Sequence, residues 1–134
     1  MATGSRKITF TLAGLSGVSG IGALIVGVSD NVPGIVLCYI AVALLFIALT
    51  HTWREMKRFL ILTGASFIGF FVFVLLHNAF YGLGIITSDI PVVSHFMEFS
   101  HVAFFCLAIL VCPPGFVVGA VGSIVFGVRK LRVR

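Results

Sequence analysis

The basic residues of this chain occur in three short clusters, and long apolar stretches separate the clusters. All nine lysines and arginines belong to them: Arg6 and Lys7; Arg54, Lys57 and Arg58; and Arg129, Lys130, Arg132 and Arg134. Because basic loops of membrane proteins are retained in the cytoplasm, an even number of spans must separate each cluster from the next. Two spans in each half predict an all-α integral membrane protein, a four-transmembrane-helix bundle with both termini in the cytoplasm.

The composition excludes a soluble domain. Of the 134 residues, 60% are hydrophobic and 10% are charged, whereas charged residues make up about 25% of soluble domains. The net charge of +5 does not favour nucleic-acid binding, because the basic residues flank apolar stretches and do not line one face with interleaved aromatic residues. We expect them to attract anionic lipid headgroups of the bilayer instead. Three of the four acidic residues lie in segments that this topology places outside: Asp30, Asp89 and Glu98.

The chain divides into four predicted spans within a single membrane domain, residues 1–134. The spans cover about residues 8–28, 35–52, 59–80 and 94–128. Turn-forming residues from Ser29 to Gly34 follow the first span. Trp53 follows the second span as an interfacial anchor, and Gly82 and Gly84 are expected to end the third helix.

The last segment is longer than a bilayer requires. Residues 94–128 would form a helix of about 52 Å, against a hydrocarbon core of about 30 Å. Pro113 and Pro114 interrupt it, and proline removes a helical hydrogen bond and disfavours helix in the preceding residue. A full break would leave residues 116–128 as a short fifth span that carries four cations outside. We therefore predict one long helix, kinked at Pro113 and Pro114, that projects beyond the outer surface.

Small residues recur every four positions in the second half of this segment: Gly115, Gly119, Ser123 and Gly127. Such a stripe lets two helix backbones approach closely in a membrane, where lipid provides little hydrophobic drive for association. The first span is also rich in glycine and serine, so we expect the first and fourth spans to contact each other. The alternative interpretation is that the stripe contacts a second copy of the chain or another membrane subunit.

Polar residues near the outer ends of the third and fourth spans form the candidate site: His77, His95, Glu98 and His101. Residues three apart on a helix lie along one face, which places Glu98 between two imidazoles. Imidazole and carboxylate together suit a divalent metal such as zinc, iron or copper, and imidazoles on neighbouring helices can hold a haem iron. The competing interpretation is that these residues are solvated or capping groups at the membrane interface.

The sequence favours a non-enzymatic structural or interaction role, as a membrane subunit or a self-associating bundle. The first alternative is haem or metal binding by the histidine cluster. The second is small-solute transport, which ordinarily requires polar groups at mid-bilayer or inverted repeats. We find no convincing repeat between residues 1–55 and 56–134, and the three cysteines, Cys38, Cys106 and Cys112, have the apolar surroundings of buried hydrophobic residues.

Overall fold

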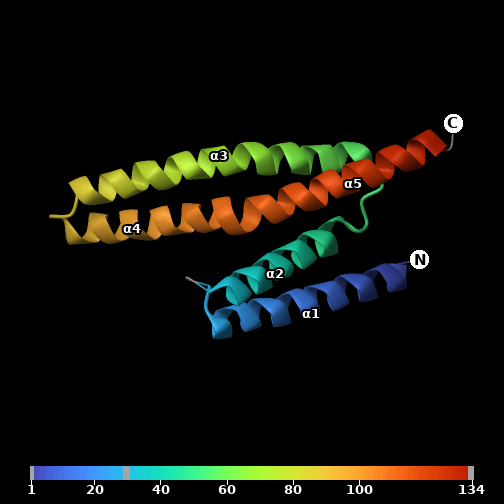
Figure 1. Cartoon of the computed structure of the whole chain (residues 1–134), viewed down its shortest axis with the longest axis horizontal. Helices are drawn as coiled ribbons and strands as arrows, with labels where there is room; N and C mark the ends of the chain where they lie inside the picture. The colour runs from blue at the N-terminus through green and yellow to red at the C-terminus, as the bar shows by residue number, and fades with distance from the viewer. Residues whose placement is uncertain (1, 29–30, 133–134) are drawn as a thin grey trace.

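The computed structural model describes residues 2–28 and 31–132, and these residues are almost entirely helical. The elements are α1 (Ala2–Val26), α2 (Val32–Thr50), α3 (Met56–Ile86), α4 (Pro91–Cys106), the π-helical turn η1 (Leu107–Val111) and α5 (Cys112–Arg132). Figure 1 shows two helical hairpins side by side. One consists of α1 and α2, and the other of α3 and the continuous run of α4, η1 and α5.

Four helices are long and apolar enough to cross a membrane, which confirms this part of the sequence prediction: Gly4–Val26, Val32–Thr50, Met56–Ile86 and Pro91–Arg132. The last three begin three residues before the predicted spans. A span prediction counts only the apolar part of a helix, whereas helical hydrogen bonding continues into the polar flanks.

The expected end of the third helix at Gly82 and Gly84 is wrong, because α3 continues through both glycines to Ile86. A Cβ atom at Gly84 would lie 3.4 Å from the Cβ atom of Met97 in α4. Gly84 therefore lets the two backbones approach each other closely. Packing against α4 outweighs the cost of about 1 kcal/mol that a glycine imposes on a helix interior.

The turn between α1 and α2 depends on two glycines. Gly27 has a φ of 87°, a left-handed conformation that glycine adopts without steric cost and that ends helices. Its carbonyl oxygen lies where a Cβ atom at Gly34 would be placed, so a larger residue at Gly34 would collide with it. Asn31 closes the turn by donating a hydrogen bond from Nδ2 to the carbonyl of Val26, at 2.8 Å.

The two prolines of the last segment do not break it, because helical structure runs from Pro91 to Arg132. Instead, the helix widens into the π-helical turn η1 immediately before them. The N–H group of Cys112 donates to the carbonyl of Leu107, five residues back, which is the π-helical pattern. A fifth span that leaves the bundle on the other side is therefore not formed.

The order of helix packing differs from the prediction. α1 contacts α2 and no other helix within the described residues, whereas α2 also contacts α5 and η1. The expected contact between the first and fourth spans is therefore wrong. The small residues of α1 serve the contact with α2 instead: Ser16 donates a hydrogen bond to the carbonyl of Ala41 at 2.7 Å, and Gly22 lies opposite Leu37. Figure 1 shows α2 between α1 and α5.

The small-residue stripe of α5 lies against α3. A Cβ atom at Gly119 would lie 2.8 Å from the backbone nitrogen of Thr63 and 3.0 Å from the carbonyl oxygen of Phe59. At Gly115 it would meet the hydroxyl of Ser66 at 2.6 Å. Gly122, which is outside the four-residue spacing, is against the ring of Phe59. Gly127 lies beside Met56, while Ser123 donates to the carbonyl of Gly119 in its own helix, at 2.8 Å.

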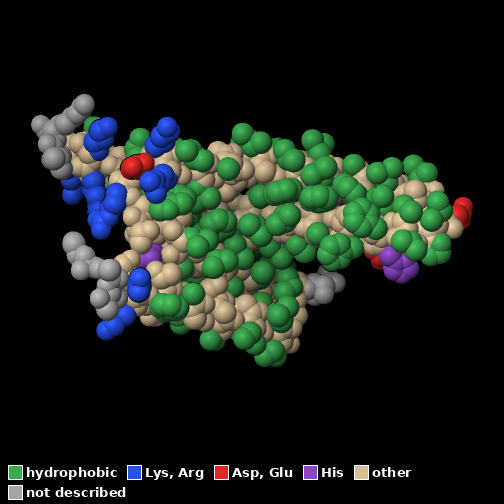
Figure 2. Space-filling model, turned by 180° about the vertical axis from the view of Figure 1, so that it is seen from behind, with side chains coloured by type: hydrophobic (Ala, Val, Ile, Leu, Met, Phe, Trp, Pro, Cys, Tyr) green, Lys and Arg blue, Asp and Glu red, His purple; other side chains and the backbone are tan. Residues whose placement is uncertain are grey.

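The two ends of the molecule differ in charge, and the two hairpins differ in length. The start of α1, the α2–α3 connection and the end of α5 lie together, and Figure 2 shows Lys and Arg side chains gathered there; we call this the basic end. The opposite, or far, end carries the α1–α2 and α3–α4 turns. Helix α3 has 31 residues and α2 has 19, a difference of about 18 Å of helix. The α3–α4 turn accordingly extends well beyond the α1–α2 turn (Figure 1).

Candidate functional site

Two of the four candidate residues meet where α3 faces α4. The Nδ1 atom of His77 lies 2.9 Å from the carbonyl oxygen of His101, and the two imidazole centroids are 5.4 Å apart. A carbonyl oxygen only accepts hydrogen bonds, so Nδ1 of His77 must carry the proton. In the neutral form of this ring, Nε2 is then the acceptor atom, which is the atom that binds a metal ion.

Aromatic side chains surround this histidine pair. Tyr81 lies one turn after His77 and packs edge-on against His101, with centroids 5.6 Å apart. Phe105 lies one turn after His101 and is 5.3 Å from the ring of His77. The i, i+4 spacing of both pairs is visible in the sequence and could have identified these neighbours. The pair is therefore half-buried among rings and is not fully solvated.

A small groove of about 210 Å³ opens beside the pair. It is lined by Tyr81, Gly84, Ile85, Ser94, Glu98 and His101. The lining brings together a phenol, a hydroxyl, a carboxylate and an imidazole, all of which exchange hydrogen bonds or protons. The volume lies below the usual range for small-molecule pockets, about 300 to 1,000 Å³.

His95 and Glu98 are exposed on α4. His95 does not line the groove; its Nδ1 donates to the carbonyl of Pro91 in its own helix, at 2.7 Å. Within residues 2–28 and 31–132, no group of three or more His, Cys, Asp or Glu side chains could hold a metal ion. The metal or haem hypothesis stays a prediction, and its geometric basis is the pair of His77 and His101, with Glu98 at the same groove as His101.

His51, at the basic end, has partners that the sequence did not suggest. Its Nε2 lies 3.3 Å from the hydroxyl of Ser5 and 3.4 Å from that of Thr9, and its Nδ1 lies 2.8 Å from the carbonyl of Ala48. Because Nδ1 must donate to that carbonyl, Nε2 of the neutral ring can accept from the Ser5 hydroxyl, whereas the Thr9 hydroxyl donates to the carbonyl of Ser5 at 3.1 Å. His51 therefore connects the start of α1 to the end of α2. The sequence signal for this contact was the spacing of Ser5 and Thr9, which are one helical turn apart.

Two adjoining spaces open at the basic end. The first, which we call the basic mouth, has a volume of about 830 Å³ and is lined by Arg54, Glu55, Met56, Lys57, Leu60, Phe126, Arg129 and Lys130. The second, the interhairpin groove, has a volume of about 410 Å³ and is lined by Ala43, Ile47, Thr50, His51, Trp53, Phe59, Val117, Val118, Val121, Gly122 and Phe126. Phe126 borders both spaces.

The three basic clusters were predicted to attract lipid headgroups, but the convergence of the second and third clusters on one space required the fold. Arg54 and Lys57 come from the α2–α3 connection and the start of α3, whereas Arg129 and Lys130 come from the end of α5. Comparisons with known protein families, with curated proteins and with solved structures find no match for this chain.

Proposed function

We propose that this chain is a polytopic membrane protein with four spans and both termini in the cytoplasm. It acts without catalysis, as a subunit of a larger membrane assembly or as a self-associating bundle. Two features support the membrane arrangement: the four helices long and apolar enough to span a bilayer, and the gathering of Lys and Arg side chains at one end of the molecule (Figure 2), which follows the positive-inside rule.

One observation carries the interaction role. Residues 78–86 of α3 and 91–100 of α4, which we call the far segment, present large apolar side chains on their surface. Among them, Ile86, Val92 and Phe99 are 78%, 81% and 74% exposed. The other exposed apolar residues of the segment are Tyr81, Leu83, Ile85 and Phe96. Contiguous exposed apolar surface marks a contact site when lipid does not cover it.

The position of the far segment argues that a protein covers it. A hydrocarbon core of about 30 Å spans about 20 helical residues. Counted from Phe59, the first residue after the basic cluster, that distance ends near residue 79 of α3. The residues beyond it extend past the α1–α2 turn (Figure 1), at and beyond the interface. Exposure to water would be costly for these side chains, so we assign the segment to contact with another membrane chain or a second copy of this one.

Photo-crosslinking tests the proposal. A benzophenone amino acid at Phe99 in the membrane-embedded chain is expected to form a protein adduct. The same group at Ile25, which is 80% exposed but lies on the shorter hairpin, should give no protein adduct because lipid surrounds it. An adduct of twice the chain mass of 14.4 kDa indicates self-association, and another mass indicates a different subunit. Absence of any protein adduct at Phe99 in the correctly inserted chain would contradict the interaction role.

A further inference from the structure

We propose that the basic end binds one anionic phospholipid, with its phosphate between Arg54 and Arg129 and one acyl chain in the interhairpin groove between α2 and α5. The inference rests on the membrane insertion proposed above and adds a defined site and ligand class to it. It is carried by the junction of the basic mouth with the interhairpin groove at Phe126.

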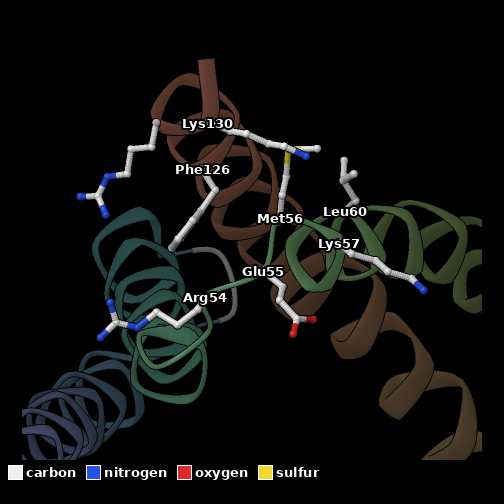
Figure 3. Close-up of a pocket in the computed structure, with 8 residues that line it drawn as sticks. Arg54, Glu55, Met56, Lys57, Leu60, Phe126 and Lys130 are labelled. Carbon is white, nitrogen blue, oxygen red and sulfur yellow. The ribbon is translucent and has the colours of Figure 1, made fainter. Parts of the chain in front are cut away.

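The two arginines lie around the aromatic residue that joins the two spaces. The guanidinium carbon of Arg129 is 5.7 Å from the ring centroid of Phe126. Figure 3 shows Phe126 directed from α5 toward α2, on the same side of the mouth as Arg54, whereas Lys57 points to the other side. Arginine presents a planar set of donors that matches a phosphate group. Two guanidinium groups at this junction provide the charge that an anionic headgroup requires.

Little negative charge is available within the protein to neutralise these arginines. Glu55 is the one carboxylate in the lining of the mouth, and it pairs with Arg58 at 3.3 Å. No carboxylate side chain in the described part of the chain forms an ion pair with Arg54 or Arg129. The mouth is therefore complementary to an anion, and anionic lipids of the cytoplasmic leaflet are the abundant anions at that depth.

The groove behind the mouth is suited to a hydrocarbon chain. Its volume of about 410 Å³ lies within the range of ligand pockets, and most of its lining is aliphatic or aromatic. The hydroxyl and the imidazole in the lining have partners within the protein: Thr50 donates to the carbonyl of Phe46 at 2.7 Å, and His51 Nδ1 donates to that of Ala48 at 2.8 Å. An occupant therefore needs no polar groups within the groove.

The length of the groove matches one lipid leaflet. From Val117 to Phe126 the lining extends over ten residues of α5, about 14 Å of helix, close to half of a hydrocarbon core of about 30 Å. Beyond that point α2 and η1 are joined by the hydrogen bond from the Tyr39 hydroxyl to the carbonyl of Ile109, at 2.8 Å. A partner helix, about 10 Å in diameter, does not suit a groove of this volume, and free phosphate would leave its apolar part unused.

Tryptophan fluorescence offers a direct test, because Trp53 is the single tryptophan of the chain and lines the groove. Its ring lies 5.3 Å from that of Phe59, which stacks on Phe126 at 5.4 Å. The full chain in detergent micelles is titrated with phosphatidylglycerol brominated on the upper acyl chain, and separately with phosphatidylcholine brominated at the same positions. We expect saturable quenching at lower concentration for phosphatidylglycerol, because the choline cation of the other lipid is repelled by the arginines.

Paired variants distinguish lipid binding at this site from general attraction to surface charge. Arg54→Gln with Arg129→Gln should weaken the quenching by phosphatidylglycerol about tenfold or more, since two charge-assisted hydrogen bonds are lost. Arg6→Gln with Arg132→Gln removes the same amount of charge at positions outside both spaces. This pair should change the quenching by phosphatidylglycerol less than twofold. Ala43→Phe fills the end of the groove that is nearest to Tyr39 and should reduce quenching by both lipids, whereas Val36→Phe, elsewhere on α2, should not.

The outcomes distinguish this site from the membrane proposal. Equal quenching by both lipids, unaffected by either arginine pair, would overturn the site and leave membrane insertion intact. Competition by millimolar inorganic phosphate without any need for the acyl chain would identify a free-phosphate site and overturn the lipid assignment. If brominated phosphatidylcholine bilayers reconstituted with the chain leave Trp53 unquenched, insertion itself is wrong and the site is overturned with it.

Discussion

At the scale of single residues, the carbonyl oxygen of Ile109 shows how the two hairpins are joined. In an α-helix this oxygen would accept from residue 113, and in a π-helix from residue 114. Both are prolines, and neither has an N–H group. Tyr39 of α2 supplies the missing donor at 2.8 Å. The hydrogen bond satisfies a backbone group that would otherwise have no partner within its helix, and in the proposed membrane no water could replace that partner.

Replacing Tyr39 with Phe removes this hydroxyl and keeps the ring. We expect a loss of about 1 to 3 kcal/mol in the free energy of unfolding, the usual cost of leaving a buried acceptor unsatisfied, measured by thermal denaturation in detergent. Tyr81→Phe is the matched control, because no hydrogen bond of the Tyr81 hydroxyl occurs among the described residues. Equal melting temperatures for Tyr39→Phe and the wild type would show that this hydrogen bond does not hold the hairpins together.

The sequence predicted a disturbance near Cys112 but could not predict its donor. Proline chemistry is local, so the place where helical hydrogen bonding fails can be found from Pro113 and Pro114 alone. The partner is 70 residues away, and its position depends on how α2 packs against the second hairpin. The same limit applies to the candidate sites. His77 and His101 both lie near the outer ends of their predicted spans, so the sequence suggested that they meet. It could not show that Arg54 and Arg129 meet at Phe126, because that depends on tertiary packing.

At the scale of helices, the small residues of α5 allow contact with α3. The spacing of Gly115, Gly119, Ser123 and Gly127 predicted close packing but not its partner, because a stripe of small residues fits any helix that approaches it. Sequential helices pack together most readily, and α3 is the helix that precedes the last segment. Gly122 was missed because it lies outside the four-residue spacing, on the part of α5 that meets the Phe59 ring.

Enlarging the contact residues tests this packing. Gly119→Leu places atoms against the Thr63 nitrogen and the Phe59 carbonyl, and backbone atoms cannot move aside as a flexible side chain can. We expect a loss of at least about 1 to 3 kcal/mol, the usual range for overpacking, in thermal unfolding in detergent. Val125→Leu, at a position that is 42% exposed, should have little effect. Equal stability of the two variants would show that the α3–α5 contact does not require a small residue at Gly119.

At the scale of the whole molecule, charge and length together support the proposed orientation. The buried core consists chiefly of small side chains, among them Ala23, Ala41, Ala48 and Ala108, while large apolar side chains face outward. This distribution suits lipid as the surrounding solvent, because close backbone contact replaces hydrophobic burial between helices. The projection of the last helix was predicted from its length, but the matching extension of α3 was not. Gly82 and Gly84 resemble helix-ending residues, whereas α3 continues through both, and Gly84 packs against Met97.

Cysteine labelling tests the orientation directly. In a background without Cys38, Cys106 and Cys112, a cysteine at Asp89 in the α3–α4 turn should react with an impermeant thiol reagent added to intact cells. Cysteines at Arg54 and Arg132 should react only after permeabilisation, because positively charged segments are retained in the cytoplasm. A cysteine at Asp30 should behave like one at Asp89, although Asp30 lies outside the described residues. External labelling at Arg132 would contradict the proposed four-span topology, since it would place the two ends of the last helix on the same side of the membrane.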